Sequence, residues 1–201
     1  MEGCTAGGPK TTGPTGSSRA FAIVHLAMRD AARAACLPGA DTYTGVQYAG
    51  PLTDTAQHAA IAAAAQCTLA ALWPEYEGYF TEHATQDPMP HGQGLAEGHR
   101  LGVEIATKLL HLRANDGADK QPHYASSSAY GRHRVDPVNP GQSFLGPQWG
   151  NVAHFVLPPG PVQLDPPPGY GKSDFLDDPD YLEDHKEVRK LVLLSVETSG
   201  V

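Results

Sequence analysis

Apolar residues in the first part of the chain recur at the spacing of an amphipathic helix. Between residues 19 and 36 they stand three or four positions apart, and the preceding Ser17 and Ser18 can cap a helix N-terminus. Residues 54–72, almost half of them alanine, predict a second helix, because alanine has the highest intrinsic helix propensity. Such a thin helix can also pack closely against its neighbours.

A third long helix is predicted over residues 92–114, after a short amphipathic piece near residues 75–85. One of its faces carries small residues four positions apart, namely Gly94, Gly98, Gly102 and Ala106. Glycine inside a helix costs about 1 kcal/mol relative to alanine. We therefore expect close contact with another helix to compensate for this stripe. The alternative is that part of the region is a loop.

The second half of the chain shows no sustained hydrophobic period until its end. Residues 117–178 are rich in proline, glycine and aspartate, and an irregular segment of this length is usually functional or lies over a partner surface. Pro179 then fits the first position of a last helix. The pattern predicts an all-α protein, a helical bundle with a long Pro/Gly-rich irregular segment. Its parts are a flexible lead-in (1–17), a bundle part (18–116), the irregular segment (117–178), and a terminal helix and tail (179–201).

Charge and composition argue against several classes of partner. The formal net charge is -8, and no cluster of lysine and arginine provides the basic surface that nucleic acid or anionic lipid requires. The sequence contains no apolar run of about 18 residues that would span a bilayer, and its polar N-terminus predicts no secretory signal. The spacing of Cys4, Cys36 and Cys67 fits neither a disulfide framework nor a zinc site.

Motifs for other kinds of site are incomplete. Residues 171–173, Gly-Lys-Ser, resemble the end of a phosphate-binding loop, but Pro166 stands where that motif needs a glycine. The ten histidines show no metal-binding spacing, and we expect His25 to be a core residue of the first helix. The basic triplet at 132–134 together with Lys172 is a candidate anion site, although solvated loop charges explain it more simply.

Three segments of the chain together resemble one enzyme family. The first is residues 18–31 (SRAFAIVHLAMRDA). The second is the alanine-rich helix ending at 72–74 (LWP), with the glycine-striped helix that ends at 112–117 (LRANDG). The third is 147–155 (PQWGNVAHF), followed by a proline-rich run and a helix that contains EVRKL. Over residues 18–195, their order and spacing resemble the N-terminal helical half of vanadium-dependent haloperoxidases, relatives of the type 2 phosphatidic acid phosphatases.

The resemblance implies a larger all-helical bundle whose chemistry lies in its second half. In that family, lysine and arginine side chains, a Pro-Ser-Gly-His segment and a later histidine bind vanadate, where hydrogen peroxide oxidises a halide. This chain contains no Pro-Ser-Gly-His, and its one Gly-His pair, Gly98-His99, lies on a predicted helix. We therefore assign it no catalytic, cofactor-binding or metal-binding residue and expect no cofactor in this chain alone.

Two functional hypotheses are consistent with these observations. In the first, the chain is the N-terminal part of a haloperoxidase-like protein and is inactive alone. Its partner is then the C-terminal half, and Trp149 and Phe155 anchor the irregular segment over it. In the second, the chain is a non-catalytic helical module that binds a partner or self-associates through uncovered helix faces. A truncated gene product is a further explanation.

Overall fold

A computed structural model of the chain describes residues 13–86, 92–129, 132–142, 144–158 and 165–198. Within these ranges it contains five α-helices, three short 3₁₀ helices and no strand, which confirms the all-α prediction. The chain divides into two compact units, residues 1–160 and 161–201, and the first unit holds four of the five α-helices. In the part of the chain that is described, no helix is long and apolar enough to cross a membrane.

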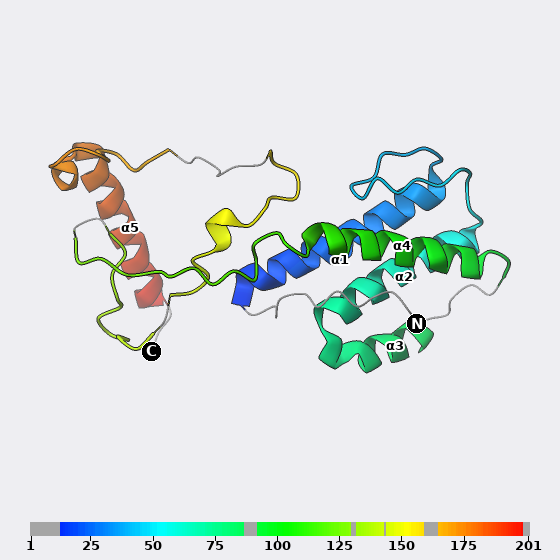
Figure 1. Cartoon of the computed structure of the whole chain (residues 1–201). Coiled ribbons are helices and arrows are strands. Elements are labelled where there is room, and N and C mark those ends of the chain that lie inside the picture. Colours follow the sequence, from blue (N-terminus) through cyan, green and yellow to red (C-terminus); the bar gives the residue numbers. More distant parts are fainter. Residues whose placement is uncertain (1–12, 87–91, 130–131, 143, 159–164, 199–201) are drawn as a thin grey trace. The chain divides into compact units, whose positions relative to one another are not determined.

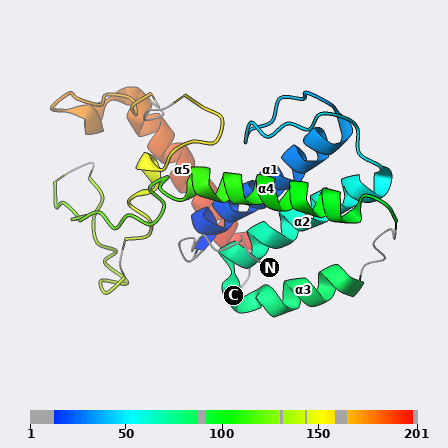
Figure 2. The ribbon, with the colours of Figure 1, turned by 45° about the vertical axis from the view of Figure 1, so that its right-hand side comes forward.

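Three long helices form the bundle of the first unit: α1 (Gly13–Cys36), α2 (Asp54–Leu72) and α4 (Leu95–Arg113). They lie side by side in Figure 1 and stay adjacent in the turned view of Figure 2. The helix α1 runs opposite to the other two (Figure 1). The core between them is mostly alanine, and its largest fully buried aliphatic side chains are Ile23, Ile105 and Leu109.

The contact expected at the small-residue stripe is present between α2 and α4. A Cβ added at Gly98 would overlap the backbone carbonyl of Ala56, and one added at Gly102 would overlap that of Ala60. Both pairs advance by four residues along the chain, so the two helices run parallel at this contact. The glycines are therefore required by close approach of the backbones, as the sequence predicted.

Two helix boundaries differ from the predictions. The helix α1 begins at Gly13, and Ser18 lies inside it, where its hydroxyl donates a hydrogen bond to a backbone carbonyl four residues earlier. The helix α4 begins at Leu95, because Gly94 has a left-handed φ of 92° and stands at the N-cap. The rest of the predicted lead-in, residues 1–12, lies outside the described residues.

The remaining elements are short or peripheral to the bundle. The helix α3 (Glu77–Gln86) follows the 3₁₀ helix η1 (Pro74–Tyr76) and packs against α2. The described residues of the first unit that follow α4 are irregular apart from η2 (Trp149–Asn151). Irregular chain over most of residues 114–158 confirms the segment that the Pro/Gly-rich composition predicted there.

The second unit contains η3 (Phe175–Asp177) and the terminal helix α5 (Pro179–Thr198). Proline occupies the first helical position, as predicted. The ring of Phe175 meets that of Tyr181 edge-on, with 5.6 Å between the ring centroids. The next residues of α5, 182–191, are all exposed, so the described part of this unit buries little of the apolar side of its helix.

Candidate functional site

Two arginines and one aspartate are buried together where the beginning of α1 meets the end of α4. Arg19 Nε lies 2.8 Å from Asp116 Oδ2, and Arg113 Nη2 lies 2.7 Å from the same oxygen. The three side chains are at most 5% exposed. The other carboxylate oxygen of Asp116 accepts a hydrogen bond of 3.1 Å from the backbone N–H of Ala118. We call Arg19, Arg113 and Asp116 the arginine centre.

The arginine centre holds one more positive charge than negative, and a buried charge is costly unless it is paired and hydrogen-bonded. Backbone carbonyls supply part of the compensation. Arg19 Nη2 donates to the carbonyl of Arg113 (2.9 Å), and Arg113 donates to the carbonyls of Ala153 (2.6 Å) and His154 (3.2 Å). Two buried atoms, Arg19 Nη1 and Arg113 Nε, have no hydrogen-bond partner among the described residues.

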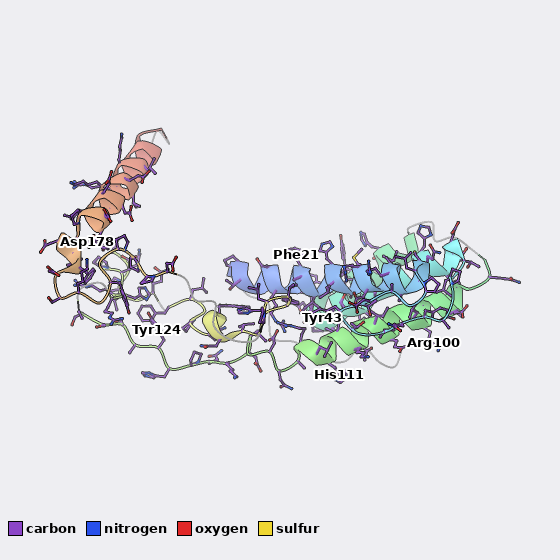
Figure 3. All side chains as sticks on the ribbon, turned by 90° about the horizontal axis from the view of Figure 1, so that it is seen from above. Phe21, Tyr43, Arg100, His111, Tyr124 and Asp178 are labelled. Carbon is purple, nitrogen blue, oxygen red and sulfur yellow. The ribbon has the colours of Figure 1, made fainter. Side chains whose placement is uncertain are left out.

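The same centre anchors the far end of the irregular chain of the first unit. The backbone N–H of Ala153 donates to the carbonyl of Asp116 at 2.8 Å. The guanidinium carbon of Arg113 lies 3.9 Å from the centre of the Phe155 ring, a cation–π contact. Phe155 also packs against the core and faces Tyr43, whose side chain lies along the bundle in Figure 3. The chain between α4 and these anchoring residues is therefore closed into one long loop.

Phe155 packs on the core of this chain's own bundle. The predicted anchoring of the irregular segment over a C-terminal half stays a prediction. Trp149, the other predicted anchor, is half-buried in η2. It lies against Gly146, whose φ of 62° and close approach to the indole ring leave no room for a side chain. Trp149 therefore shapes the loop locally.

The structure brings together residues from three distant segments of the chain, 18–31, 112–117 and 147–155. Arg19 belongs to the first segment, Arg113 and Asp116 to the second, and residues 153–155 to the third. No pattern in the sequence predicts a contact between these residues. Their convergence joins the beginning of α1, the end of α4 and the returning irregular chain.

One signal in the sequence points to the arginine centre. Arg19 stands four positions before the fully buried Ile23, and Arg113 stands four positions after the fully buried Leu109. Residues four apart share a helix face, so both arginines fall on apolar stripes. A charged residue in that position requires a buried partner, although the spacing alone does not identify that partner.

A second buried carboxylate, Asp30, holds the loop that follows α1. Its Oδ2 accepts hydrogen bonds from the backbone N–H and the hydroxyl of Thr44, at 2.8 and 3.0 Å. Its Oδ1 accepts from the half-exposed guanidinium of Arg29 at 3.0 Å. This carboxylate is saturated by its own chain, so it positions the loop that carries Tyr43.

The remaining residues singled out from the sequence are distributed over both units, with His25 and residues 132–134 in the first and Lys172 in the second. His25 is exposed, and the expectation of a core histidine is wrong, because the buried Ile23, Val24 and Ala27 occupy the opposite side of α1. His133 of the basic triplet pairs through Nδ1 with the hydroxyl of Tyr124 at 2.8 Å. In the second unit, Lys172 Nζ donates to Asp178 Oδ2 at 2.8 Å, and Asp178 directly precedes α5.

No group of three or more histidine, cysteine, aspartate or glutamate side chains able to hold a metal ion occurs within the described ranges. Cys36 is an exposed free thiol, and Cys67 is buried in α2. Cys4 lies outside the described residues.

Comparisons of the chain with protein-family models, with curated proteins and with solved structures found no match. The similarity to haloperoxidases therefore rests on the three sequence segments and stays a prediction.

Proposed function

We propose that this chain is the N-terminal helical scaffold of a haloperoxidase-like protein and carries no catalytic site of its own. The observation that supports the proposal is the arginine centre, where the three family-like segments meet. Arg19 and Asp116 are 97 positions apart, and Arg113 and Ala153 are 40 apart. Because the three segments contribute to one buried centre, each of them is needed for the same packing arrangement.

The arginine centre does not fit vanadate as a ligand. A trianionic oxoanion needs several cationic or hydrogen-bond donor groups around it and, in this family, one imidazole ligand. Both arginines are instead engaged by Asp116 and by backbone carbonyls. His154 contacts the arginine centre through its backbone carbonyl, which accepts a hydrogen bond from Arg113. The groups that bind vanadate would therefore come from a C-terminal helical half, and the parent activity would be oxidation of a halide by peroxide.

The full-length transcript is the most direct test of this proposal. We expect the coding sequence to continue, in frame or after an intron, into a Pro-Ser-Gly-His segment. A stop codon directly after this chain, with no such segment downstream, would contradict the proposal.

An activity assay on the purified chain provides an independent test. With bromide, hydrogen peroxide and vanadate, we expect turnover at the background level, because both arginines of the buried centre are engaged by Asp116 and no imidazole of the described residues reaches it as a ligand. Joining the chain to its C-terminal half should restore turnover. Robust halide oxidation or stoichiometric vanadate uptake by the chain alone would show that it has its own site.

A helical interaction module is the second candidate function. The observation that favours it is the apolar side of α5, where Leu182, Val188 and Leu191 are exposed by 38%, 59% and 57%. Uncovered apolar surface of this kind marks interaction sites. Sedimentation velocity over a range of concentrations tests it for self-association, which a monodisperse monomer at every concentration would exclude.

A further inference from the structure

The irregular segment of the first unit forms a pocket that the proposed scaffold function does not use. Two stretches of chain, 120–124 and 144–148, line a cavity of about 330 Å³. Pro122 and Pro147 contribute apolar surface, and the aromatic rings of Tyr124 and Phe144 complete it. The volume lies at the lower end of the range of small-molecule sites, about 300–1,000 Å³.

Three aromatic rings hold one another in place at this pocket. The rings of Tyr124 and Phe144 meet edge-to-face with their centroids 4.8 Å apart, and the imidazole of His133 meets Phe144 in the same way at 4.7 Å. The hydroxyl of Tyr124 and Nδ1 of His133 form a hydrogen bond of 2.8 Å. Figure 3 shows Tyr124 on the irregular chain, outside the bundle. Such mutually packed rings present a fixed surface against which another ring packs favourably.

The charge at the pocket is positive. Lys120 is the one charged side chain of the lining, and it forms no ion pair within the described part of the chain. The amide of Gln148 is already used, because it donates to the carbonyl of Ala118 at 3.2 Å. The ammonium group of Lys120 attracts an anionic group.

We propose that this pocket binds a small aromatic carboxylate, with its ring against Phe144 and Tyr124 and its carboxylate on Lys120. The volume of the pocket suits a small molecule. The aromatic wall matches the ring of such a molecule, and the ammonium group of Lys120 matches its carboxylate. The proposal is independent of the scaffold function, since it requires neither vanadate nor a C-terminal half.

Titration of the full chain with 2-naphthoate, followed by amide NMR, tests the proposal. We expect saturable shifts at the amides of Lys120, Tyr124 and Phe144. Two matched probes separate the contributions: 2-naphthylmethylamine keeps the ring with the opposite charge, and cyclohexanecarboxylate keeps the charge without the aromatic ring. Both should bind more weakly than 2-naphthoate. Equal binding of all three, shifts confined to other residues, or no saturation at millimolar probe would overturn the proposal.

Two substitutions test the residues named. Phe144→Ala should weaken binding of 2-naphthoate about tenfold through loss of ring contacts. Lys120→Met should weaken it about threefold, as expected for a partly exposed ion pair. Lys186→Met, on the exposed face of α5, is the matched control and should bind like the unaltered chain. Circular dichroism should show unchanged helix content in all three, since none lies in the bundle. Unaltered affinity in Phe144→Ala and Lys120→Met would exclude this pocket.

Discussion

Arg19 and Asp116 form a buried ion pair of 2.8 Å across 97 positions of the chain. The contact joins the beginning of α1 to the residues that follow α4, at the point where the irregular chain leaves the bundle. More than half of the buried apolar residues are alanine, which buries little apolar area per residue. The stability of the first unit therefore depends on this ion pair more strongly than it would if the core consisted of larger side chains.

Loss of the carboxylate should destabilise the first unit more than loss of one arginine. Asp116→Asn leaves two buried guanidinium groups without their counter-charge, and we expect the free energy of unfolding to fall by about 3–5 kcal/mol. Arg19→Met leaves the Arg113–Asp116 pair, which is neutral overall, so the expected loss is about 1–3 kcal/mol. Denaturant unfolding followed by circular dichroism measures both.

The control for these two variants is Arg189→Met, which removes an exposed arginine from α5. Its effect should stay within about 0.5 kcal/mol. If Asp116→Asn proved as stable as Arg19→Met, the charge balance described for the arginine centre would be incorrect.

The close contact of α2 and α4 predicts that glycine-to-alanine substitutions have opposite effects on stability inside and outside this contact. Gly98→Ala places a methyl group on the carbonyl of Ala56, so the helices must separate, and we expect a loss of about 1–3 kcal/mol despite the better helix propensity of alanine. Gly78→Ala in α3 meets nothing within 4 Å and should gain up to about 1 kcal/mol. Thermal and denaturant unfolding of both variants test this, and a stabilising Gly98→Ala would refute the close contact.

Local patterns were sufficient to predict the helices and one of their contacts. Alanine content, the glycine stripe and Pro179 act within a few residues, and α2, the α2–α4 contact and the start of α5 follow from them. The start of α1 did not follow, because a serine such as Ser18 can bond a carbonyl of the preceding turn as readily as it caps a helix. His25 was misplaced because alanine on several faces of α1 weakens the contrast between its sides.

The arginine centre and the pocket could not be predicted in the same way. Each depends on residues from distant parts of the chain, and no periodic pattern in the irregular segment indicates which of its residues return to the bundle. The arginines on apolar stripes indicated a need for partners. Only the folded chain identifies Asp116 and the carbonyl of Ala153 as those partners.

Phe155 should determine whether the long loop stays closed. Phe155→Ala removes the ring under Arg113 and its contact with the core, with an expected loss of about 2 kcal/mol. The amide of Ala153, which donates to Asp116, should then exchange its hydrogen faster. Val156→Ala, at a neighbouring side chain that is 88% exposed, should change neither quantity. Equal exchange at Ala153 in both variants would contradict the anchoring role.

The start of α5 should depend on pH through Asp178 and Lys172, which lie 2.8 Å apart. The hydrogen bond from Lys172 holds the pKa of Asp178 below its ordinary value of 3.8, and the same bond raises the pKa of Lys172 above 10.5. The contribution of Asp178 to stability is therefore present above its unfolded-state pKa and lost as the pH falls through its folded value. That of Lys172 is present below its unfolded-state pKa and lost as the pH rises through its folded value.

Carboxyl ¹³C NMR of Asp178 measures this coupling directly. Lys172→Met should raise the pKa of Asp178 towards its ordinary value, whereas Lys186→Met should leave it unchanged, because no contact joins Lys186 to that carboxylate. Asp178 also accepts a hydrogen bond from the backbone N–H of Asp180 in the first turn of α5. Its protonation should therefore loosen that turn, and amide exchange of Asp180 should quicken at acid pH. If Asp178 titrates at its ordinary value in the unaltered chain, the contact with Lys172 does not form in solution.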